Sequence, residues 1–253
     1  MRNLIIVSAT LFLAVSPAGF AQEEEEEAPP TYVQATYFYC HVSKEGDADK
    51  VVKEQFAPIY DAAVEAGTIN AWGWLAHRNG GKWRRVLYHS ANGIDALMDA
   101  GDKLYAATDE AVGDDTTFGD ACGGHDDYIW QSEDVGTGAA ERGPAGFSVY
   151  FYCDQTRESR ADEIVTEHFA PAYDKLVEDG KITSWGWSQH FVGGKIRRLL
   201  TMTGDSHKAV LHARNDAINA VFGDEEATAA GQEFSAICGD HLDYMWDIQI
   251  ENP

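Results

Sequence analysis

Two histidines at equivalent positions in the sequence are the leading candidates for catalytic chemistry. His77 and His190 each lie three residues after a Trp-Gly-Trp motif. An imidazole can act as a general base near neutral pH or can ligate a metal ion. A structural hydrogen bond at the end of a strand is the alternative interpretation. We take His77 and His190 as the candidate catalytic residues.

Tryptophan and arginine pairs near these histidines form the candidate ligand-binding set. Successive side chains of a strand point to opposite faces, so the two indoles of each Trp-Gly-Trp motif share a face and could wall an aromatic pocket. Two adjacent arginines follow each motif, and guanidinium groups suit a carboxylate or other anion on a ligand. Alternatively, the indoles form core under the helices and the arginines pair with nearby Asp or Glu. The candidates are Trp72, Trp74, Arg84, Arg85, Trp185, Trp187, Arg197 and Arg198.

A Cys-x-x-His motif that continues as His-x-Asp occurs twice, starting at Cys122 and at Cys238. This spacing could contribute to a metal site, with the carboxylate orienting the imidazole. Cysteines joined in a disulfide cannot bind a metal as thiolates, and the motif then forms an anchored turn. We expect the turn and no metal ligand or cofactor, with haem or metal left open. The secondary candidates are His125, Asp127, His241 and Asp243.

Motifs of several enzyme classes are absent. The sequence has no P-loop, no Gly-x-Gly-x-x-Gly fingerprint, no Gly-x-Ser-x-Gly elbow, no His-Glu-x-x-His and no Cys-x-x-Cys-His. The formal net charge of −23 repels nucleic acid and anionic lipid. A cationic partner would fit this charge, and a charge that keeps the protein in solution is the alternative interpretation. We expect no nucleic-acid partner and a small-molecule ligand.

The N-terminus has the features of an export signal. Arg2 precedes a mostly apolar stretch of about 12 residues, which is too short to span a bilayer. Gly19-Phe20-Ala21 then places small residues at a cleavage site. An uncleaved membrane anchor is the alternative. We expect a signal peptide at 1–21, an acidic disordered leader at 22–34, and a periplasmic or extracellular protein with no membrane insertion after cleavage.

Most of the remaining sequence consists of two similar copies of one repeat. Tyr37-Phe38-Tyr39-Cys40 recurs as Tyr150-Phe151-Tyr152-Cys153, an offset of 150 − 37 = 113 residues. Toward the end of the unit the offset becomes 238 − 122 = 116 residues. A unit of roughly 100 residues is a whole domain, not a solenoid module. We expect repeat domains at 35–134 and 147–250, joined by a flexible linker at 135–146.

Each copy is expected to follow the order β-α-β-β-α-β. Pro58 lies inside the first helical pattern and predicts a kink or local break there. This order is the split βαβ of ferredoxin-like α+β folds. In the first copy, side-chain patterns predict strands at 36–42, 69–77, 82–89 and 127–132 and helices at 48–66 and 94–107.

The four cysteines are expected to form two disulfides. In this fold the sheet order is 4-1-3-2, so the end of strand 1 lies beside the start of the antiparallel strand 4. Cys40 ends strand 1 and Cys122 precedes strand 4, and Cys153 and Cys238 repeat the arrangement. An exported chain also favours disulfides. The predicted bridges are Cys40–Cys122 and Cys153–Cys238.

The chain resembles the dimeric α+β barrel superfamily, which includes antibiotic-biosynthesis-type monooxygenases, EthD-like and NIPSNAP-like proteins, and chlorite-dismutase-like haem proteins. The resemblance rests on the strand and helix order of both copies. It also rests on the passage from Gly67-Thr68-Ile69 to Trp72-Gly73-Trp74, with a counterpart from Gly180 to Trp187. It implies that two sheets pack face to face as a pseudo-dimeric barrel, in a monomer or a homodimer.

Three functions agree with these residues. The first is an exported ligand-binding or accessory protein whose sheets enclose an aromatic-lined cavity with Arg and His as polar anchors. The second is a cofactor-independent oxygenase or related barrel enzyme that uses His77 or His190 as a base. The third is a structural or interaction module. A pocket at which Trp, Arg and His converge would favour the first two, and a filled interior would favour the third.

Overall fold

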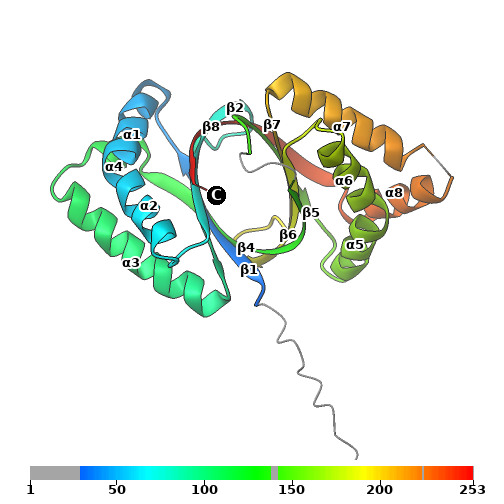
Figure 1. Cartoon of the computed structure of the whole chain (residues 1–253), viewed down its shortest axis with the longest axis horizontal. Coiled ribbons are helices and arrows are strands. Elements are labelled where there is room, and N and C mark those ends of the chain that lie inside the picture. The colour runs from blue at the N-terminus through cyan, green and yellow to red at the C-terminus, as the bar shows by residue number, and fades with distance from the viewer. Residues whose placement is uncertain (1–28, 138–141, 224, 253) are drawn as a thin grey trace, which may run out of the picture.

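The chain folds into a closed β-barrel with its helices on the outside (Figure 1). The computed structural model describes residues 29–137, 142–223 and 225–252, so the expected signal peptide at 1–21 lies outside the described residues. Eight strands follow one another around the barrel in the order β1-β3-β2-β8-β5-β7-β6-β4, and each neighbouring pair is antiparallel. They are β1 (Thr31–Tyr39), β2 (Ala71–Gly80), β3 (Arg85–Asn92), β4 (Gly124–Thr137), β5 (Ala145–Tyr152), β6 (Ser184–Val192), β7 (Arg198–Gly204) and β8 (Asp240–Asn252).

The two halves of the chain contribute equivalent parts of the barrel. Their strand orders, β4-β1-β3-β2 and β8-β5-β7-β6, confirm the expected 4-1-3-2 arrangement. The halves join where β2 pairs with β8 and where β4 pairs with β6. The protein is therefore an α+β protein with a closed eight-stranded barrel. Descent of the halves from one duplicated unit remains an interpretation of the sequence.

Two strands are longer than their sequence patterns predict. β1 begins at Thr31 and not at residue 36, so part of the expected leader at 22–34 belongs to the barrel. β4 continues to Thr137, inside the expected linker at 135–146, because Gly136 pairs with Trp185 of β6. The added residues of β1 pair with β3 and β4 of the same half, and those of β4 pair with β6 of the other half. Neither pairing is revealed by a local pattern.

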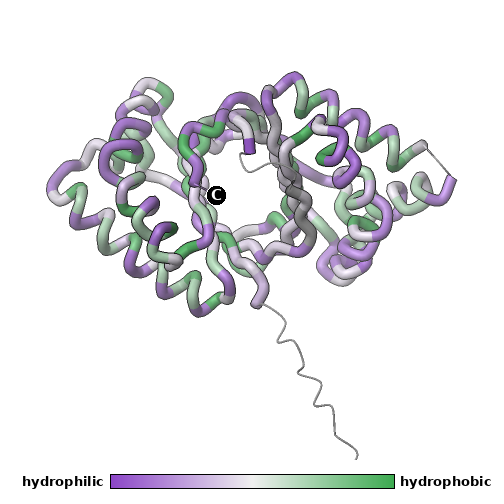
Figure 2. Tube along the Cα trace, in the orientation of Figure 1, coloured by the Kyte–Doolittle hydropathy of each residue, from purple (hydrophilic) through white to green (hydrophobic). Residues whose placement is uncertain are grey.

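The helices form two groups on opposite sides of the barrel (Figure 1). Figure 2 shows hydrophobic and hydrophilic residues mixed along these outer helices, as expected when one side is buried and the other is exposed. Among the described residues, no helix is both long enough and apolar enough to cross a bilayer. The α-helices are α1 (Glu45–Val51), α2 (Ala57–Glu65), α3 (Ile94–Val112), α4 (Thr117–Ala121), α5 (Glu158–Ile164), α6 (Ala170–Glu178), α7 (His207–Val221) and α8 (Glu225–Ile237).

A π-helical turn interrupts the first helical segment of each half. The turns Val52–Phe56 and Val165–Phe169 directly precede the helices α2 and α6, whose first turns contain proline. Proline has no N–H to donate and clashes with the preceding turn of a regular helix. The wider turn therefore accommodates the proline, and the break predicted at Pro58 is confirmed.

Both predicted disulfides are present. Cys40 bonds Cys122 and Cys153 bonds Cys238, across 82 and 85 residues of sequence. Backbone hydrogen bonds hold the joined segments together, from His41 N to Ala121 O at 2.8 Å and, in the second half, at an equivalent position. Because the described cysteines are all bridged, they cannot serve as thiolate ligands for a metal.

His89 on β3 is buried beneath the helices of the first half. It is 2% exposed, and its Nε2 has no hydrogen-bond partner among the described residues. Its ring meets Tyr60 edge-on at a centroid distance of 6.1 Å. Burial lowers the pKa of His89 to about 4. The imidazole is therefore neutral in the folded protein at neutral pH.

Replacing His89 by methionine, the residue at the equivalent position 202, is expected to reduce acid sensitivity. Below pH 6.5 the unfolded chain binds a proton at His89, whereas the folded chain does not until about pH 4. Wild-type stability is therefore lost as the pH falls from 6.5 toward 4. Between pH 7 and pH 4.5, urea unfolding should show that His89→Met loses about 2 kcal/mol less stability than the wild type. Equal losses would contradict this role of His89.

Candidate functional site

Aromatic side chains fill one end of the barrel interior. Tyr37 stacks on Trp83 with ring centroids 4.3 Å apart, and Trp83 stacks on Tyr244 at 5.2 Å. Tyr128 and Tyr150 meet this group edge-on. The turns after β2 and β6 and the two disulfides lie at the same end. Ligand access from this end is therefore blocked by packed rings.

A cavity of about 370 Å³ occupies the rest of the interior. Its apolar wall comes from side chains of both halves: Tyr37, Leu75, Trp130, Tyr150, Leu199 and Trp246. Hydroxyl groups are spread among them, from Ser90, Ser148, Ser184, Thr201 and Thr203. A pocket of this size, with apolar walls and a few polar groups, suits a small organic molecule.

The inner end of the cavity carries two buried phenols. Trp130 Nε1 donates a hydrogen bond to Tyr37 Oη at 3.2 Å. The Tyr37 and Tyr150 rings lie edge to face, with centroids 5.5 Å apart. Burial raises the pKa of both tyrosines well above the usual value. Both phenols therefore stay protonated at neutral pH and present neutral hydrogen-bonding groups.

A charged cluster borders the other end of the cavity. Tyr88 on β3 donates a hydrogen bond to the carboxylate of Glu251 on β8. Arg142, just before β5, lies 3.1 Å from Glu251 through Nη1 and donates to Tyr88 Oη at 3.4 Å and to Ser184 Oγ at 3.4 Å. The Glu251 side chain is 11% exposed and that of Arg142 is 29% exposed. Burial raises the pKa of Tyr88, so its hydroxyl remains a donor.

The sequence interpretation did not identify this cluster. One signal was available, because Gly73 lies on the same face of its strand as Leu75. A Cβ at Gly73 would lie 2.5 Å from the Tyr88 ring, so glycine is required for the ring to reach its place. In the first half, the glycine of the Trp-Gly-Trp motif therefore lies on the face of the strand toward Tyr88 and the cavity, and neither indole borders the cavity.

The two candidate catalytic histidines lie beside the filled end of the barrel and do not border the cavity. Arg84 donates to Nδ1 of His77 at 2.7 Å, and Arg197 donates to Nδ1 of His190 at 2.8 Å. Burial and the adjacent guanidinium lower the pKa of each histidine. Each imidazole is therefore neutral, and its basic nitrogen is occupied by an arginine.

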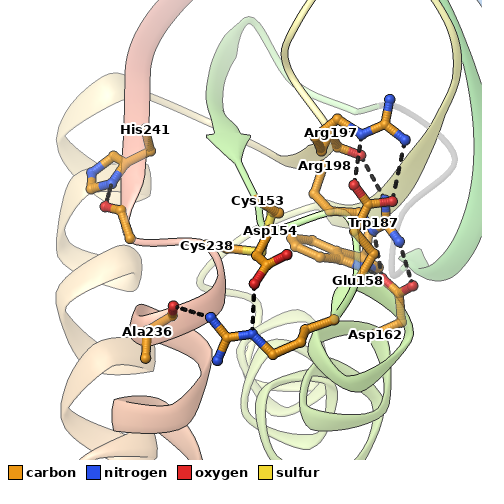
Figure 3. The surroundings of a disulfide bond; sticks show 12 residues. Cys153, Asp154, Glu158, Asp162, Trp187, Arg197, Arg198, Ala236, Cys238 and His241 are labelled. Atoms are coloured by element: carbon orange, nitrogen blue, oxygen red, sulfur yellow. Dashed lines mark hydrogen bonds and ion pairs between the residues drawn. A yellow bond between two sulfur atoms is a disulfide. The ribbon is translucent and has the colours of Figure 1, made fainter.

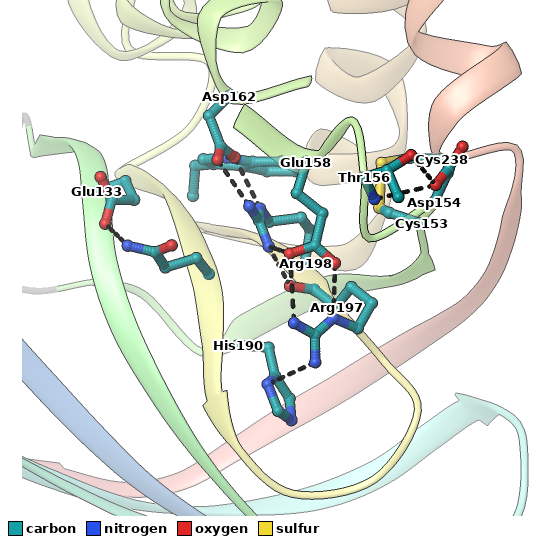
Figure 4. A network of polar contacts seen from close by, with 12 residues as sticks. Glu133, Cys153, Asp154, Thr156, Glu158, Asp162, His190, Arg197, Arg198 and Cys238 are labelled. Atoms are coloured by element: carbon teal, nitrogen blue, oxygen red, sulfur yellow. Dashed lines mark hydrogen bonds and ion pairs between the residues drawn. A yellow bond between two sulfur atoms is a disulfide. The ribbon is translucent and has the colours of Figure 1, made fainter. Parts of the chain in front are cut away.

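The arginine pairs bind carboxylates of their own half (Figures 3 and 4). Arg198 contacts Asp162 through Nε at 2.7 Å and Nη2 at 2.6 Å, and Glu158 through Nη1 at 3.1 Å. Arg85 contacts Asp49 and Glu45 in the equivalent way. Figure 4 shows Arg197 linking Glu158 to His190. These guanidinium groups are already paired and do not face the cavity.

The four tryptophans of the Trp-Gly-Trp motifs pack between the sheet and the helices. Trp72 donates to Asp61 at 2.8 Å and Trp74 to Asp49 at 2.8 Å. Trp185 and Trp187 make the same bonds to Asp174 and Asp162, at 2.7 and 2.9 Å. Trp185 alone among the eight candidate ligand-binding residues also borders the cavity. The set is therefore divided between core positions and ion pairs.

The secondary candidates lie on the outer surface of the sheet. His125 Nδ1 is 2.9 Å from Asp127, and His241 Nε2 is 3.7 Å from Asp243. Each of these four side chains is at least 40% exposed. Within the described parts of the chain, no three His, Cys, Asp or Glu side chains are grouped to hold a metal ion.

Comparison with known proteins gives a fold likeness without a sequence likeness. No protein-family model and no curated protein matches the chain. A proposed monooxygenase from Lactobacillus acidophilus NCFM matches with a TM-score of 0.59 at 5% identity, over 88% of this chain and 95% of that one. An anthrone oxidase-like protein gives 0.53 at 15% identity, over 89% and 94%. A mutant chlorite dismutase from Candidatus Nitrospira defluvii gives 0.53 at 8% identity, over 87% and 91%.

These likenesses agree with the closed barrel, and the chain has the fold of the dimeric α+β barrel proteins. Sequence identities this low establish the fold alone. Function has to be argued from the site itself.

Proposed function

We propose that the protein binds a small, largely apolar molecule inside its barrel. The cavity of about 370 Å³ carries this proposal, because aromatic and aliphatic walls surround it while hydroxyl groups and one charged cluster supply hydrogen bonds. A binding or accessory role needs no reactive group beyond these. Arg142 and Glu251, and not the arginine pairs or His77 and His190, are the polar anchors of this site.

The ligand is expected to bind in one orientation. The positions equivalent to Tyr88 and Glu251 are Thr201 and Val135, at offsets of 113 and 116 residues. The charged cluster therefore has no equivalent in sequence. A ligand with one polar end and one apolar end would place its polar end near Glu251 and Arg142 and its apolar end near the rings of Tyr37 and Tyr150.

The protein is proposed to work outside the cytoplasm. Its two disulfides persist in an oxidising compartment, and the first residues have the pattern of a signal peptide. One chain closes the whole barrel, so a monomer can provide the complete cavity.

Blocking the cavity is expected to abolish binding of a neutral aromatic probe. The probe N-phenyl-1-naphthylamine gains fluorescence in apolar surroundings, and titration gives its dissociation constant. Leu75→Trp adds an indole to the cavity wall and should weaken binding at least about tenfold, at a cost in stability of about 1–3 kcal/mol. The matched variant Leu211→Trp changes a side chain 39% exposed on α7 and should bind as the wild type does. Equal binding by both variants would contradict a site in the cavity.

An oxygenase is the second candidate, and the Tyr88–Glu251–Arg142 cluster favours it. A carboxylate beside an apolar cavity can accept a proton from an acidic C–H or O–H group of a substrate. Glu251, and not His77 or His190, would be the base, with the Tyr88 hydroxyl as hydrogen-bond donor. Two solved structures of similar fold are described as a proposed monooxygenase and as an anthrone oxidase-like protein, and this reaction class is therefore the one to assay.

The oxygenase candidate is tested with anthrone and dioxygen. Oxidation of the anthrone CH₂ group to a carbonyl consumes one O₂ and releases one water, so an oxygen electrode follows it. Faster O₂ uptake with the wild type than with Glu251→Gln would support the enzyme. O₂ uptake equal to the protein-free rate, together with binding of N-phenyl-1-naphthylamine, would contradict the oxygenase and support ligand binding as the function.

A further inference from the structure

A second hollow lies outside the barrel in the first half of the chain. It has a volume of about 590 Å³ and lies between the outer face of β1, β3 and β4 and the helices α2, α3 and α4. None of its lining residues borders the central cavity. It is therefore independent of the function proposed above.

The hollow combines aromatic rings with carboxylates. Five aromatic side chains line it: Phe38, Phe56, Tyr60, Tyr105 and Phe118. Asp109, Asp115 and Asp127 add carboxylates, and no lysine or arginine is among the described residues that line it. Aromatic faces and carboxylates together attract an organic cation.

In the second half of the chain, an arginine lies against the counterparts of two residues that line the hollow. Arg214 on α7 is at the position of Gly101 on α3, an offset of 113 residues. The two helices share a register, since their buried residues Leu97 and Leu104 match Val210 and Ala217 at the same offset. The large cationic side chain of Arg214 in the second half therefore corresponds to a glycine, which has no side chain, in the first half.

Arg214 contacts an aromatic ring and a carboxylate. Its guanidinium carbon lies 5.4 Å from the centre of the Phe147 ring, and its Nη2 lies 3.6 Å from Asp243. Asp243 is the counterpart of Asp127 at an offset of 116 residues, and Gln34 replaces Phe147 in the first half. The second half thus holds its own organic cation against the equivalent carboxylate.

We propose that the hollow of the first half binds an organic cation, an ammonium or guanidinium group on an aromatic or aliphatic body. Asp127 is its counter-ion and takes the part that Asp243 has toward Arg214. One Asp127 oxygen accepts a hydrogen bond from Thr36 at 2.8 Å and the other lies 2.9 Å from His125 Nδ1. A carboxylate has about four acceptor sites, so further donors can be accommodated.

Isothermal titration calorimetry with benzamidinium tests the charge preference. Neutral benzamide and anionic benzoate have nearly the same shape and serve as controls. Benzamidinium is expected to bind roughly fivefold or more tightly than benzamide, because it gains a cation–π contact and a partly exposed ion pair. Benzoate should not bind. Equal affinity for the cation and the neutral amide would overturn the proposal.

Two reciprocal variants locate the site. Gly101→Arg supplies the arginine of the second half and should abolish benzamidinium binding. A Cβ at Gly101 would meet its nearest neighbours, His89 and Tyr105, at 3.8 Å, which is ordinary van der Waals contact. Arg214→Gly opens the equivalent space and should raise the stoichiometry from one site to two. Unchanged binding in Gly101→Arg would contradict the site.

Two further measurements distinguish loss of this site from misfolding of the variant and from binding in the central cavity. Asp127→Asn is expected to weaken benzamidinium binding about threefold to fivefold while benzamide binding stays the same. N-phenyl-1-naphthylamine should bind Gly101→Arg as it binds the wild type, which shows that the variant is folded and that its barrel is intact. If Asp127→Asn weakened the binding of benzamidinium and of benzamide equally, Asp127 would not be a specific counter-ion for the cation.

Discussion

Replacing Arg198 by methionine is expected to lower the free energy of unfolding by about 3–5 kcal/mol. Its side chain is 2% exposed and pairs with Asp162 and Glu158 (Figures 3 and 4). Methionine preserves much of the volume but leaves both carboxylates without their buried partner. Asp162 also accepts the indole N–H of Trp187, so the change affects the core beneath the helices. Urea unfolding followed by circular dichroism measures the loss.

An exposed arginine of the same half provides the control. Arg157 pairs with Asp154 and has a side chain 47% exposed. Arg157→Met should change the free energy of unfolding by less than about 1 kcal/mol. If Arg198→Met were as mild as this control, the buried ion pairs would not be a source of stability in the folded protein.

Removing one disulfide is expected to have an effect of similar size. The double variant Cys153→Ala/Cys238→Ala should lose about 4 kcal/mol, because the bridge closes a loop across 85 residues and restricts the unfolded chain. The loss should appear as a lower midpoint of urea unfolding under non-reducing conditions.

The other disulfide serves as an internal comparison. Cys40→Ala/Cys122→Ala opens a loop across 82 residues and should show nearly the same loss. Adding a reductant to the wild type should reproduce the combined effect of both double variants. A loss below about 1 kcal/mol for either pair would show that the unfolded chain is not restricted in this way.

Sequence patterns predicted the parts of the fold that depend on local order. The repeated motifs defined two equivalent halves, and the expected sheet order placed Cys40 beside Cys122. Pro58 marked the helix break because the missing N–H acts within one turn. Strand ends were less well predicted, since the extra residues of β4 pair with β6 only after the barrel closes.

The candidate site depended on information that local patterns do not carry. Alternation showed that Trp72 and Trp74 share one face of their strand. It could not show whether that face is turned toward the helices or toward the barrel interior, because side chains alternate with the same two-residue period on both faces. Tyr88 and Glu251 lie 163 residues apart and meet only through the closed strand order. Arg142 lies just outside the strands in a segment with linker composition. The arginine and histidine motifs were recognised, yet their partners Glu45 and Glu158 belong to helices whose packing no motif indicates.

The most direct test of a ligand-binding barrel is a crystal structure of the protein with N-phenyl-1-naphthylamine. Density for the probe is expected inside the barrel, with its rings beside Tyr37, Tyr150 and Trp246 and its amine toward Glu251 and Arg142. Probe density only on the outer surface, or a barrel interior closed by side chains with no probe, would contradict it.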